Sequence, residues 1–277
     1  MYSCLRYDWN MTNTIRPVGE YLRQWRQRRR LSQLDLALEA EISTRHLSFM
    51  ETGRALPSRE MVLRLAERLD IPLRERNALL LAAGYAPMFL QRKLDDPALQ
   101  AVRKAMELVL AGHEPYPALA IDRHWNLVAA NKALPPLLDG VDPALLQPPV
   151  NVLRLSLHPQ GMAPRIANYW EWRAHLFERL RRQIDLSADP VLTELLHELS
   201  GYPAPDGLAP QASGSSQAYA GVVVPLQLAS PAGTLSFIST TTLFGTPLDV
   251  TLSELALESF FPADERTAQA LQRHAAL

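Results

Sequence analysis

The segment between residues 20 and 69 constrains the fold most, because its apolar and capping residues recur at the spacing of short α-helices. Ser32 and Ser43 each precede a run of helical periodicity, where a side-chain hydroxyl can accept a hydrogen bond from a free backbone N–H. Asp35 follows Ser32 by three residues, as in a capping box, and Gly53 supplies the left-handed backbone that ends a helix. The pattern predicts an all-α bundle of short helices joined by tight turns.

Five helices are expected in this bundle, and their apolar residues can face a shared core. The third is expected over residues 44–52, the fourth begins at Pro57, and the fifth covers residues 74–83 and is closed by Gly84 and Pro87. The side chains predicted to face the core are Tyr21, Leu22, Trp25 and Arg26 from the first helix, Leu34, Ala37 and Leu38 from the second, Leu47 and Met50 from the third, and Met61, Val62, Leu65, Ala66 and Leu69 from the fourth.

The short third helix presents polar and basic side chains on its outward face, which is the layout of a helix-turn-helix module. In such modules the N-terminal residues of the recognition helix reach base edges in the major groove. Arg45 could pair with guanine, and Thr44 or Ser48 could bond a base or touch a thymine methyl group. Phe49 could either pack in the core or contact a base. The candidate DNA-binding residues are Gln33, Ser43, Thr44, Arg45, His46, Ser48 and Arg54.

Other basic residues could place the module on phosphates without reading the sequence, and Gln33 is expected near the DNA backbone. Arg54 and the arginine run at residues 28–30 suit this role, although the run could also be a solvated helix end. Residues 1–95 carry 16 Lys or Arg against 11 Asp or Glu, a net charge of +5, whereas the remaining residues carry 12 against 18, a net charge of −6. This asymmetry fits one DNA-facing end with weak, salt-sensitive unspecific binding.

The sequence lacks the motifs of several other protein classes. Cys4 is the only cysteine, which excludes an intramolecular disulfide and a cysteine-based metal cluster. There is no run of about eighteen apolar residues, no signal-peptide core, and no Gly-x-Ser-x-Gly, His-Glu-x-x-His or glycine-rich phosphate loop. We expect a cytoplasmic protein that is not an enzyme and has neither catalytic residues nor metal ligands. The native start could be Met1 or Met11, and residues 1–15 are expected to form a disordered arm.

A hinge and a connector helix are expected over residues 87–112. The helix begins near Pro97 and places Leu99, Val102 and Met106 on one side, with either Val109 or Leu110 continuing that side. Charged residues occupy its opposite face. The helix could simply pack on its own domain, or, if it is exposed on both sides, it could form the seam of a homodimer.

Residues 113–277 predict an α+β domain with an antiparallel sheet covered by helices on one side. The short apolar runs at residues 118–122 and 126–130 predict a hairpin, after which Asn131 is expected to open a short helix. Further helices are expected over residues 163–184, 189–199 and 263–276, strands over residues 218–229, 233–244 and 249–255, and a loop over residues 201–216.

A sheet covered by helices can enclose a cavity for a small molecule. The guanidinium groups of Arg154 and Arg173 lie in otherwise apolar stretches and could anchor a carboxylate through paired hydrogen bonds. Alternatively, these arginines could form structural ion pairs with Glu171 or Asp185, and the aromatic residues could simply fill the core. The candidate ligand-binding residues are Trp125, Arg154, Tyr169, Trp172, Arg173 and Phe177.

Three stretches carry a resemblance to known proteins: residues 46–54 (HLSFMETGR), 74–87 (RERNALLLAAGYAP) and 115–131 (PYPALAIDRHWNLVAAN). The N-terminal part resembles the Cro/repressor-like (XRE) helix-turn-helix proteins, and about residues 16–270 resemble the MmyB-like regulators of bacteria. The resemblance implies a transcription regulator with a lambda-repressor-like bundle and a PAS-like C-terminal ligand-binding domain. It also implies effectors of the fatty-acid-like type.

These observations predict a helix-turn-helix domain at residues 16–86 and a PAS-like domain at residues 113–277. We expect a homodimer that binds a pseudo-palindromic site in double-stranded DNA and needs no cofactor or membrane. A small apolar or fatty-acid-like ligand in the C-terminal domain would change the DNA affinity. The alternative is a DNA-binding protein whose C-terminal domain is a protein-interaction or dimerisation scaffold without a small-molecule ligand.

Overall fold

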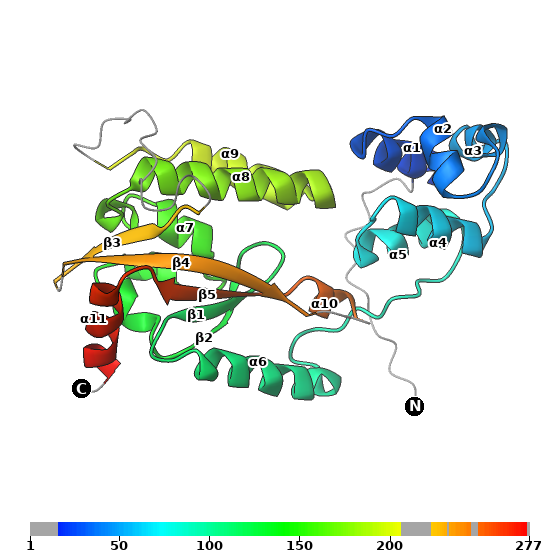
Figure 1. The fold of residues 1–277 in the computed structure, drawn as a ribbon. Coiled ribbons are helices and arrows are strands. Elements are labelled where there is room, and N and C mark those ends of the chain that lie inside the picture. Colours follow the sequence, from blue (N-terminus) through cyan, green and yellow to red (C-terminus); the bar gives the residue numbers. More distant parts are fainter. Residues whose placement is uncertain (1–15, 206–222, 232, 245–248, 276–277) are drawn as a thin grey trace. The chain divides into compact units, whose positions relative to one another are not determined.

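The chain divides after Leu90 into two compact units, a helical one and a larger one that combines helices with strands (Figure 1). The predicted fold class is confirmed, since an all-α bundle is followed by an α+β domain with an antiparallel sheet. The arm predicted for residues 1–15 lies outside the described residues. The computed structural model describes residues 16–205, 223–231, 233–244 and 249–275.

Five helices form the described part of the first unit, and serine hydroxyls cap three of them. Ser32 and Asp35 form the predicted capping box: the hydroxyl accepts from the Asp35 N–H at 3.1 Å, and the carboxylate accepts from the Ser32 N–H at 2.9 Å. Ser43 and Ser58 each accept from the N–H three residues further on. The helices are α1 (Val18–Arg28), α2 (Gln33–Glu39), α3 (Thr44–Glu51), α4 (Arg59–Arg68) and α5 (Leu73–Ala82).

The core of the first unit contains the predicted residues of α1, α3 and α4, but of the three residues predicted for α2 only Ala37 is buried. Leu34 and Leu38 are 65% and 78% exposed, whereas Leu36 and Ala37 are buried. With leucines at every second position of a seven-residue helix, more than one face is apolar, and the sequence alone does not select between them. Packing in the bundle selects the face of Leu36, Ala37 and Ala40.

Helices α1 and α3 approach so closely that residue 19 has no room for a side chain. A Cβ atom on Gly19 would lie 2.4 Å from the carbonyl oxygen of Met50 and 2.7 Å from that of Glu51. Both neighbours are backbone atoms of α3, so they cannot rotate away as a side chain would. Gly19 therefore permits the close packing of the first helix on the third.

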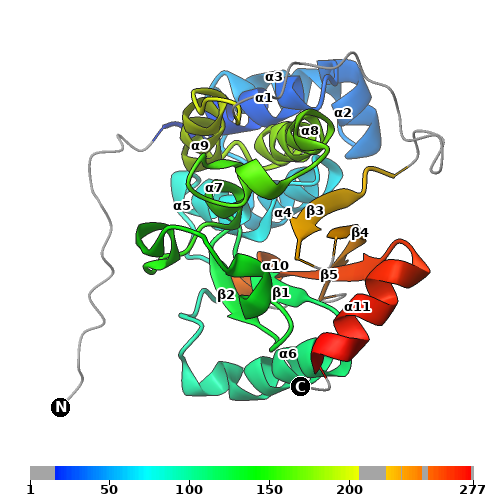
Figure 2. The same cartoon turned by 90° about the vertical axis from the view of Figure 1, so that its left-hand side faces the viewer.

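A five-stranded antiparallel sheet forms the centre of the second unit, in the order β2-β1-β5-β4-β3 (Figure 2). The predicted hairpin is confirmed, with Leu119 of one strand opposite Ala130 of the other. The last strand in sequence, β5, lies between this hairpin and β4, where Ser259 pairs with Thr240. The strands are β1 (Ala118–Ile121), β2 (Leu127–Ala130), β3 (Leu226–Ser230), β4 (Gly233–Leu243) and β5 (Ala256–Pro262).

Helices cover both faces of this sheet, rather than the single face that the sequence suggests (Figure 1). Leu119 packs into the larger core with α7, α8 and α9, whereas its neighbour Ala118 packs against Met106 of α6. Alternate residues of a strand point to opposite faces, so β1 is buried on both. The helices of this unit are α6 (Gln100–Gly112), α7 (Val152–Leu157), α8 (Tyr169–Ser187), α9 (Pro190–Ser200), α10 (Val250–Ser253) and α11 (Glu265–Ala275).

The structure differs from several expectations for this unit, and two asparagines explain two of the differences. Asn131 opens no helix, because its side chain accepts from the Ala118 N–H and donates to the carbonyls of Leu110 and Tyr116. It thereby ties the hairpin to the end of α6. The helix predicted over residues 163–184 is confirmed as α8, but it begins later than expected, at Tyr169. A 3₁₀ turn at residues 163–165 precedes the helix, and Asn168 lies directly before it. The Asn168 side chain donates to the Pro225 carbonyl and accepts from the Gln227 N–H, next to β3.

The strand predicted over residues 249–255 is also wrong. Asp249 caps the short helix α10 by accepting from the Thr251 N–H, and strand β5 follows at residue 256. The strand predicted over residues 218–229 is described only from residue 223, and β3 begins at Leu226. Its earlier part and most of the predicted loop over residues 201–216 lie outside the described residues. Strand β4 and helices α9 and α11 lie close to their predicted positions.

The residues predicted as a linker divide between the two units. Asn77 of α5 accepts from the backbone N–H groups of Met88 and Phe89, both at 3.0 Å, so this part belongs to the first unit. Arg92 pairs with Asp249 at 3.1 Å and belongs to the second. Among the described residues, no helix combines the length and the apolar character needed to span a bilayer.

Candidate functional site

Helix α3 places the predicted DNA-binding residues on one side and the core residues on the other. Leu47 and Met50 are completely buried, whereas Arg45 and His46 are exposed. The Ser43 hydroxyl is used as the helix cap, since it accepts from the His46 N–H at 3.1 Å. Thr44 and Ser48 are half-buried, and Arg54 is exposed just beyond the helix. The N-terminal half of α3 can therefore present side chains to duplex DNA, and the base contacts themselves remain predictions.

A buried ion pair holds this helix in place. Arg26 of α1 donates from Nε to Glu51 Oε1 at 2.7 Å and from Nη2 to Oε2 at 2.8 Å, and both side chains are buried. The paired hydrogen bond raises the pKa of Arg26 above its ordinary value. Gln33 of α2 donates to the same carboxylate at 2.8 Å. One carboxylate thus joins the first three helices, and the amide group of Gln33, expected near the DNA backbone, is bonded to it.

Phe49 lies between two arginines of the exposed face instead of packing fully in the core. The guanidinium carbon of Arg45 lies 5.2 Å from the centre of the Phe49 ring, and that of Arg54 lies 5.8 Å from it. Such contacts contribute about 0.5–1 kcal/mol each at exposed sites. The ring therefore restricts the positions of the Arg45 and Arg54 guanidinium groups. This role of Phe49 was not among the two expected ones.

The arginine run at residues 28–30 is only partly available to phosphates. Arg29 donates to the carbonyl oxygens of Leu69 at 2.7 Å and Asp70 at 2.9 Å, so it satisfies the free carbonyls at the end of α4. Burial lowers the pKa of Arg29 from its ordinary value. At least two of its five N–H donors are therefore used within the bundle, and the phosphate contact expected of Arg29 remains a prediction.

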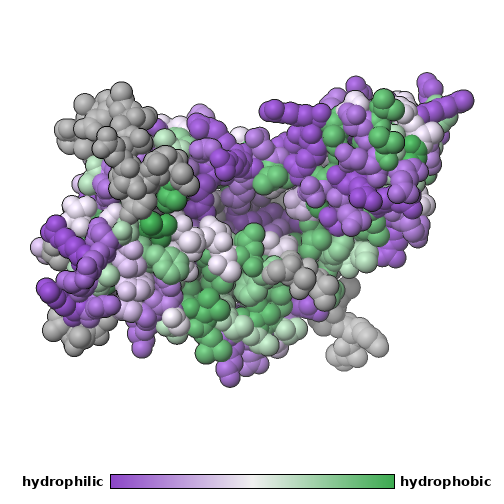
Figure 3. All heavy atoms as spheres, in the orientation of Figure 1, coloured by the Kyte–Doolittle hydropathy of each residue, from purple (hydrophilic) through white to green (hydrophobic). Residues whose placement is uncertain are grey.

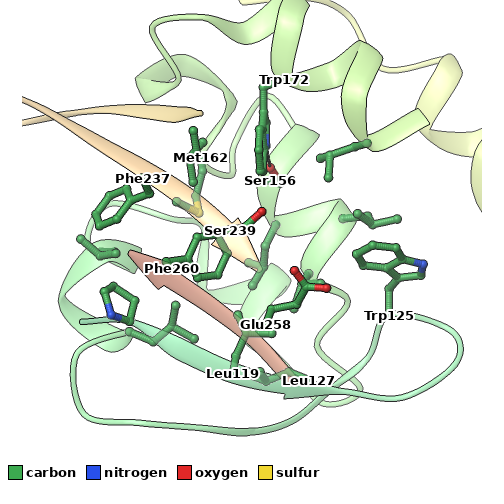
Figure 4. A pocket seen from close by; sticks show the side chains of 18 of the residues that line it. Leu119, Trp125, Leu127, Ser156, Met162, Trp172, Phe237, Ser239, Glu258 and Phe260 are labelled. Carbon is green, nitrogen blue, oxygen red and sulfur yellow. Dashed lines mark hydrogen bonds between the residues drawn. The ribbon is translucent and has the colours of Figure 1, made fainter. Parts of the chain in front are cut away.

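The second unit encloses a cavity of about 90 Å³ between the sheet and helices α7 and α8. All five strands contribute lining side chains, and most of these are apolar, such as Leu119, Met162 and Phe260 (Figure 4). Of the six residues predicted to bind a ligand, Trp125 and Trp172 line the cavity. The other four, Arg154, Tyr169, Arg173 and Phe177, do not.

Arg154 and Arg173 are held away from the cavity by other partners. Arg154 of α7 forms an ion pair with Glu198 of α9 through two hydrogen bonds, at 2.8 and 2.7 Å. Arg154 therefore forms a structural ion pair, as the alternative expected, but its partner is neither Glu171 nor Asp185. Burial raises the pKa of Tyr202, which donates to the same carboxylate, to about 12. Arg173 donates to the Ser200 carbonyl at 3.2 Å and stacks over Phe177, with its guanidinium carbon 4.3 Å from the ring centre.

Tyr169 and Phe177 belong to the packed core instead of the cavity wall. Both are at most 4% exposed and lie in the large cluster that α8 forms with the sheet. Burial raises the pKa of Tyr169 above its ordinary value. The core-packing alternative therefore describes these two aromatic residues, and helical periodicity could not separate them from Trp172, which lies on the same helix.

The charged residues that do line the cavity were not among the predicted ones. Arg179 of α8 and Glu258 of β5 face each other there, with Nη2 of the arginine 2.5 Å from Oε1 of the glutamate. Arg179 also lies over Trp125, with its guanidinium carbon 4.8 Å from the ring centre. Trp125 itself takes a left-handed backbone in the hairpin turn, with φ of 66°. Its indole N–H donates to Gln183 at 2.7 Å, which fixes the ring at the cavity wall.

The described residues contain no group of three or more potential metal ligands from His, Cys, Asp and Glu.

Two family models match the chain. One, described as the MmyB-like transcription regulator ligand binding domain, matches residues 102–273, and the other, described as a helix-turn-helix domain, matches residues 17–79. The chain belongs to the MmyB-like transcription regulators. No curated protein matches it in sequence.

The two matches agree with the division of the molecule into two units. The helix-turn-helix domain of this MmyB-like regulator is the first unit, and the ligand-binding domain contains both α6 and the cavity. The combination supports a transcription regulator that binds DNA and whose activity is modulated by a ligand. Neither matching family is an enzyme family.

Proposed function

We propose that this MmyB-like regulator binds operator DNA through α3 and that a small, mainly apolar molecule in the cavity changes its DNA affinity. The observation that carries the ligand part is the cavity itself, which lies within the ligand-binding domain and has mostly apolar walls. Helices and sheet enclose it in the way that is common for small-molecule sites. As a DNA-binding regulator, the protein would act in the cytoplasm.

The exposed half of α3 supports the DNA part of the proposal. Arg45 and Arg54 flank Phe49 on the face opposite the buried Leu47 and Met50. Their charges can attract phosphates, and the position of Arg45 near the start of the helix suits a contact with a guanine edge. We expect sequence-specific binding to double-stranded DNA, with a salt dependence set by the phosphate contacts.

We further propose that the protein acts as a homodimer whose subunits meet along α6. This helix packs on the sheet through Met106 and Leu110, which leaves Leu108 and Val109 66% and 52% exposed. Hydrophobic residues also gather on the lower part of the second unit in Figure 3, the region in which Figure 1 places α6. Sedimentation of the Leu108→Lys variant tests this, because a dimer that uses α6 should dissociate and an unchanged mass would contradict it.

Coupling between the two sites requires that the ligand bind two states of the protein unequally. Native mass spectrometry of the purified full chain would reveal a retained apolar molecule. Operator sequences would be selected from a random duplex pool. DNA affinity would then be measured by fluorescence anisotropy with and without butanol as the probe. We expect butanol to change the DNA affinity by roughly fivefold or more, as typical coupling free energies do.

The substitution Ser239→Leu places added bulk in the cavity and should abolish the response to butanol. Thr242→Leu, an exposed position on the same strand, is the matched control and should keep it. An identical butanol response in Ser239→Leu and in the control would show that the cavity is not the effector site. DNA binding that ignores every ligand would favour the scaffold alternative.

A further inference from the structure

One arginine and one glutamate supply all the formal charge on the wall of the described cavity. Arg179 and Glu258 are joined by two hydrogen bonds, Nη2 to Oε1 at 2.5 Å and Nη1 to Oε2 at 3.3 Å. Thr241 completes the cluster, since its hydroxyl accepts from Arg179 at 3.0 Å and donates to Glu258 at 2.8 Å. The polar end of the cavity is therefore electrically neutral before any ligand enters.

Glu258 is held rigidly at this position. It lies on β5 between two paired neighbours of the sheet, and its side chain is 5% exposed. Figure 4 shows its carboxylate and the Ser239 hydroxyl directed into the cavity from neighbouring strands. A ligand that reaches the polar end must therefore share the space with a fixed negative charge.

A carboxylate ligand would meet two costs at this end of the cavity. The guanidinium that could bind it already uses three of its five N–H donors within the cluster. The second anion would also lie beside the Glu258 carboxylate in an apolar enclosure, where like charges repel strongly. An uncharged amide or alcohol avoids both costs, because it can donate to Glu258 and accept from Arg179 without changing the net charge.

The other arginines near the cavity do not offer an alternative anchor. Arg154 is paired with Glu198, and Arg173 is bonded to the Ser200 carbonyl and stacked on Phe177. Neither contributes to the described lining. The described lining of the cavity therefore contains no second cation that could bind a carboxylate head group.

We propose that the Arg179–Glu258 pair makes this cavity selective for short, uncharged amphiphiles, such as amides and alcohols, over the corresponding carboxylates. The inference rests on the proposed function, because it assumes that the cavity is the effector site. It also depends on size, since a dry cavity of about 150 Å³ in another protein holds benzene and this one is smaller. The ligand is accordingly expected to be short-chained.

Butanamide and butanoate test the proposal directly, because they are short enough for the cavity and differ in charge and hardly in shape. Binding of each to the full chain would be measured by isothermal titration calorimetry at about pH 8, where the acid is ionised. We expect butanamide to bind at least roughly tenfold more tightly than butanoate. Equal affinities, or tighter binding of butanoate, would overturn the selectivity while leaving the apolar-ligand function intact. If neither compound binds, the proposed function fails together with the inference.

The substitution Glu258→Gln then identifies the source of the selectivity. It removes one negative charge while keeping the size of the side chain, so Arg179 becomes available to an anionic head group. We expect the preference to reverse, with butanoate gaining roughly tenfold or more. Glu178→Gln, an exposed position on α8 whose partner is Arg182, is the matched control and should keep the original preference. A folded Glu258→Gln protein that still prefers butanamide would overturn the role assigned to Glu258, and should this variant fail to fold, the comparison in the unaltered protein decides the proposal.

Discussion

The two units of this regulator each contain an arginine–glutamate pair with a buried carboxylate, and the two pairs have different surroundings. Arg26 and Glu51 lie inside the helical bundle, with side chains 10% and 2% exposed. Arg179 and Glu258 lie at the wall of the cavity, with side chains 24% and 5% exposed. Both pairs are bonded through two guanidinium nitrogens, so the difference between them lies in what surrounds them.

The surroundings determine what each pair can do. Around Glu51, the bonds from Arg26 and Gln33 join three helices, and the pair is enclosed by packed side chains. Around Glu258, open space remains, so a small molecule can approach the charged groups. A pair in a filled core can only stabilise or destabilise the fold, whereas a pair beside a cavity can also select a ligand.

The largest expected effect is that of Glu51→Ala on the first unit. Removing one partner of a buried pair leaves a charged guanidinium without compensation, which costs about 3–5 kcal/mol. We expect the unit to unfold at much lower urea concentration, followed through hydrogen exchange of α1 and α3 in the full chain. Glu39→Ala, an exposed carboxylate at the end of α2, is the control and should change little. Equal protection in both variants would show that the pair does not hold α3.

The substitution Glu258→Ala makes the matched change in the second unit, and a smaller loss is expected. Water can enter the cavity and solvate Arg179, so we expect about 1–3 kcal/mol, the typical cost of an unsatisfied polar group. Urea titrations followed by hydrogen exchange in β4 and β5 would measure this loss. A loss as large as that of Glu51→Ala would remove the distinction between the two pairs.

Arg45→Ala should separate DNA recognition from stability in the first unit. The side chain is exposed, and its described contact is the stacking on Phe49, so the fold should be nearly unchanged. We expect specific DNA binding to weaken by roughly 1–3 kcal/mol, with unspecific binding almost unaffected. Fluorescence anisotropy on the selected operator and on random duplex measures both. An equal loss on random DNA would identify Arg45 as a phosphate contact only.

The parts of the fold that could be predicted from sequence are those encoded by neighbouring residues. Ser32, Asp35 and Ser43 are local signals, and the helices that they begin were predicted correctly. The hairpin at β1 and β2 is likewise local. By contrast, α2 buries Leu36 instead of Leu34, because an apolar face in so short a helix is chosen by its neighbours in the bundle.

The charged residues of the cavity could not be predicted, because they meet only through tertiary packing. Arg179 and Glu258 are 79 positions apart. Arg179 stands in a run of charged residues that resembles a solvated helix face. β5 was not predicted as a strand, so nothing indicated that Glu258 would be buried. Arg154 was the more conspicuous arginine, yet packing placed it beside Glu198. The aromatic residues Trp125 and Trp172 were found because large rings are frequent on ligand-cavity walls.

The Arg154–Glu198 pair completes the comparison and should have the smallest effect, because its side chains are 41% and 37% exposed. The hydrogen bond from Arg154 lowers the pKa of Glu198 below the ordinary value of 4.5. The stabilisation is therefore fully present above about pH 4.5 and is lost as the pH falls through the lowered pKa of the folded state. Solvent screening limits it to at most about 1 kcal/mol. Melting temperatures of the unaltered protein and Arg154→Gln should differ slightly at neutral pH and converge in acid. A gap that widens in acid would mean that Glu198 is not stabilised by its arginine partner.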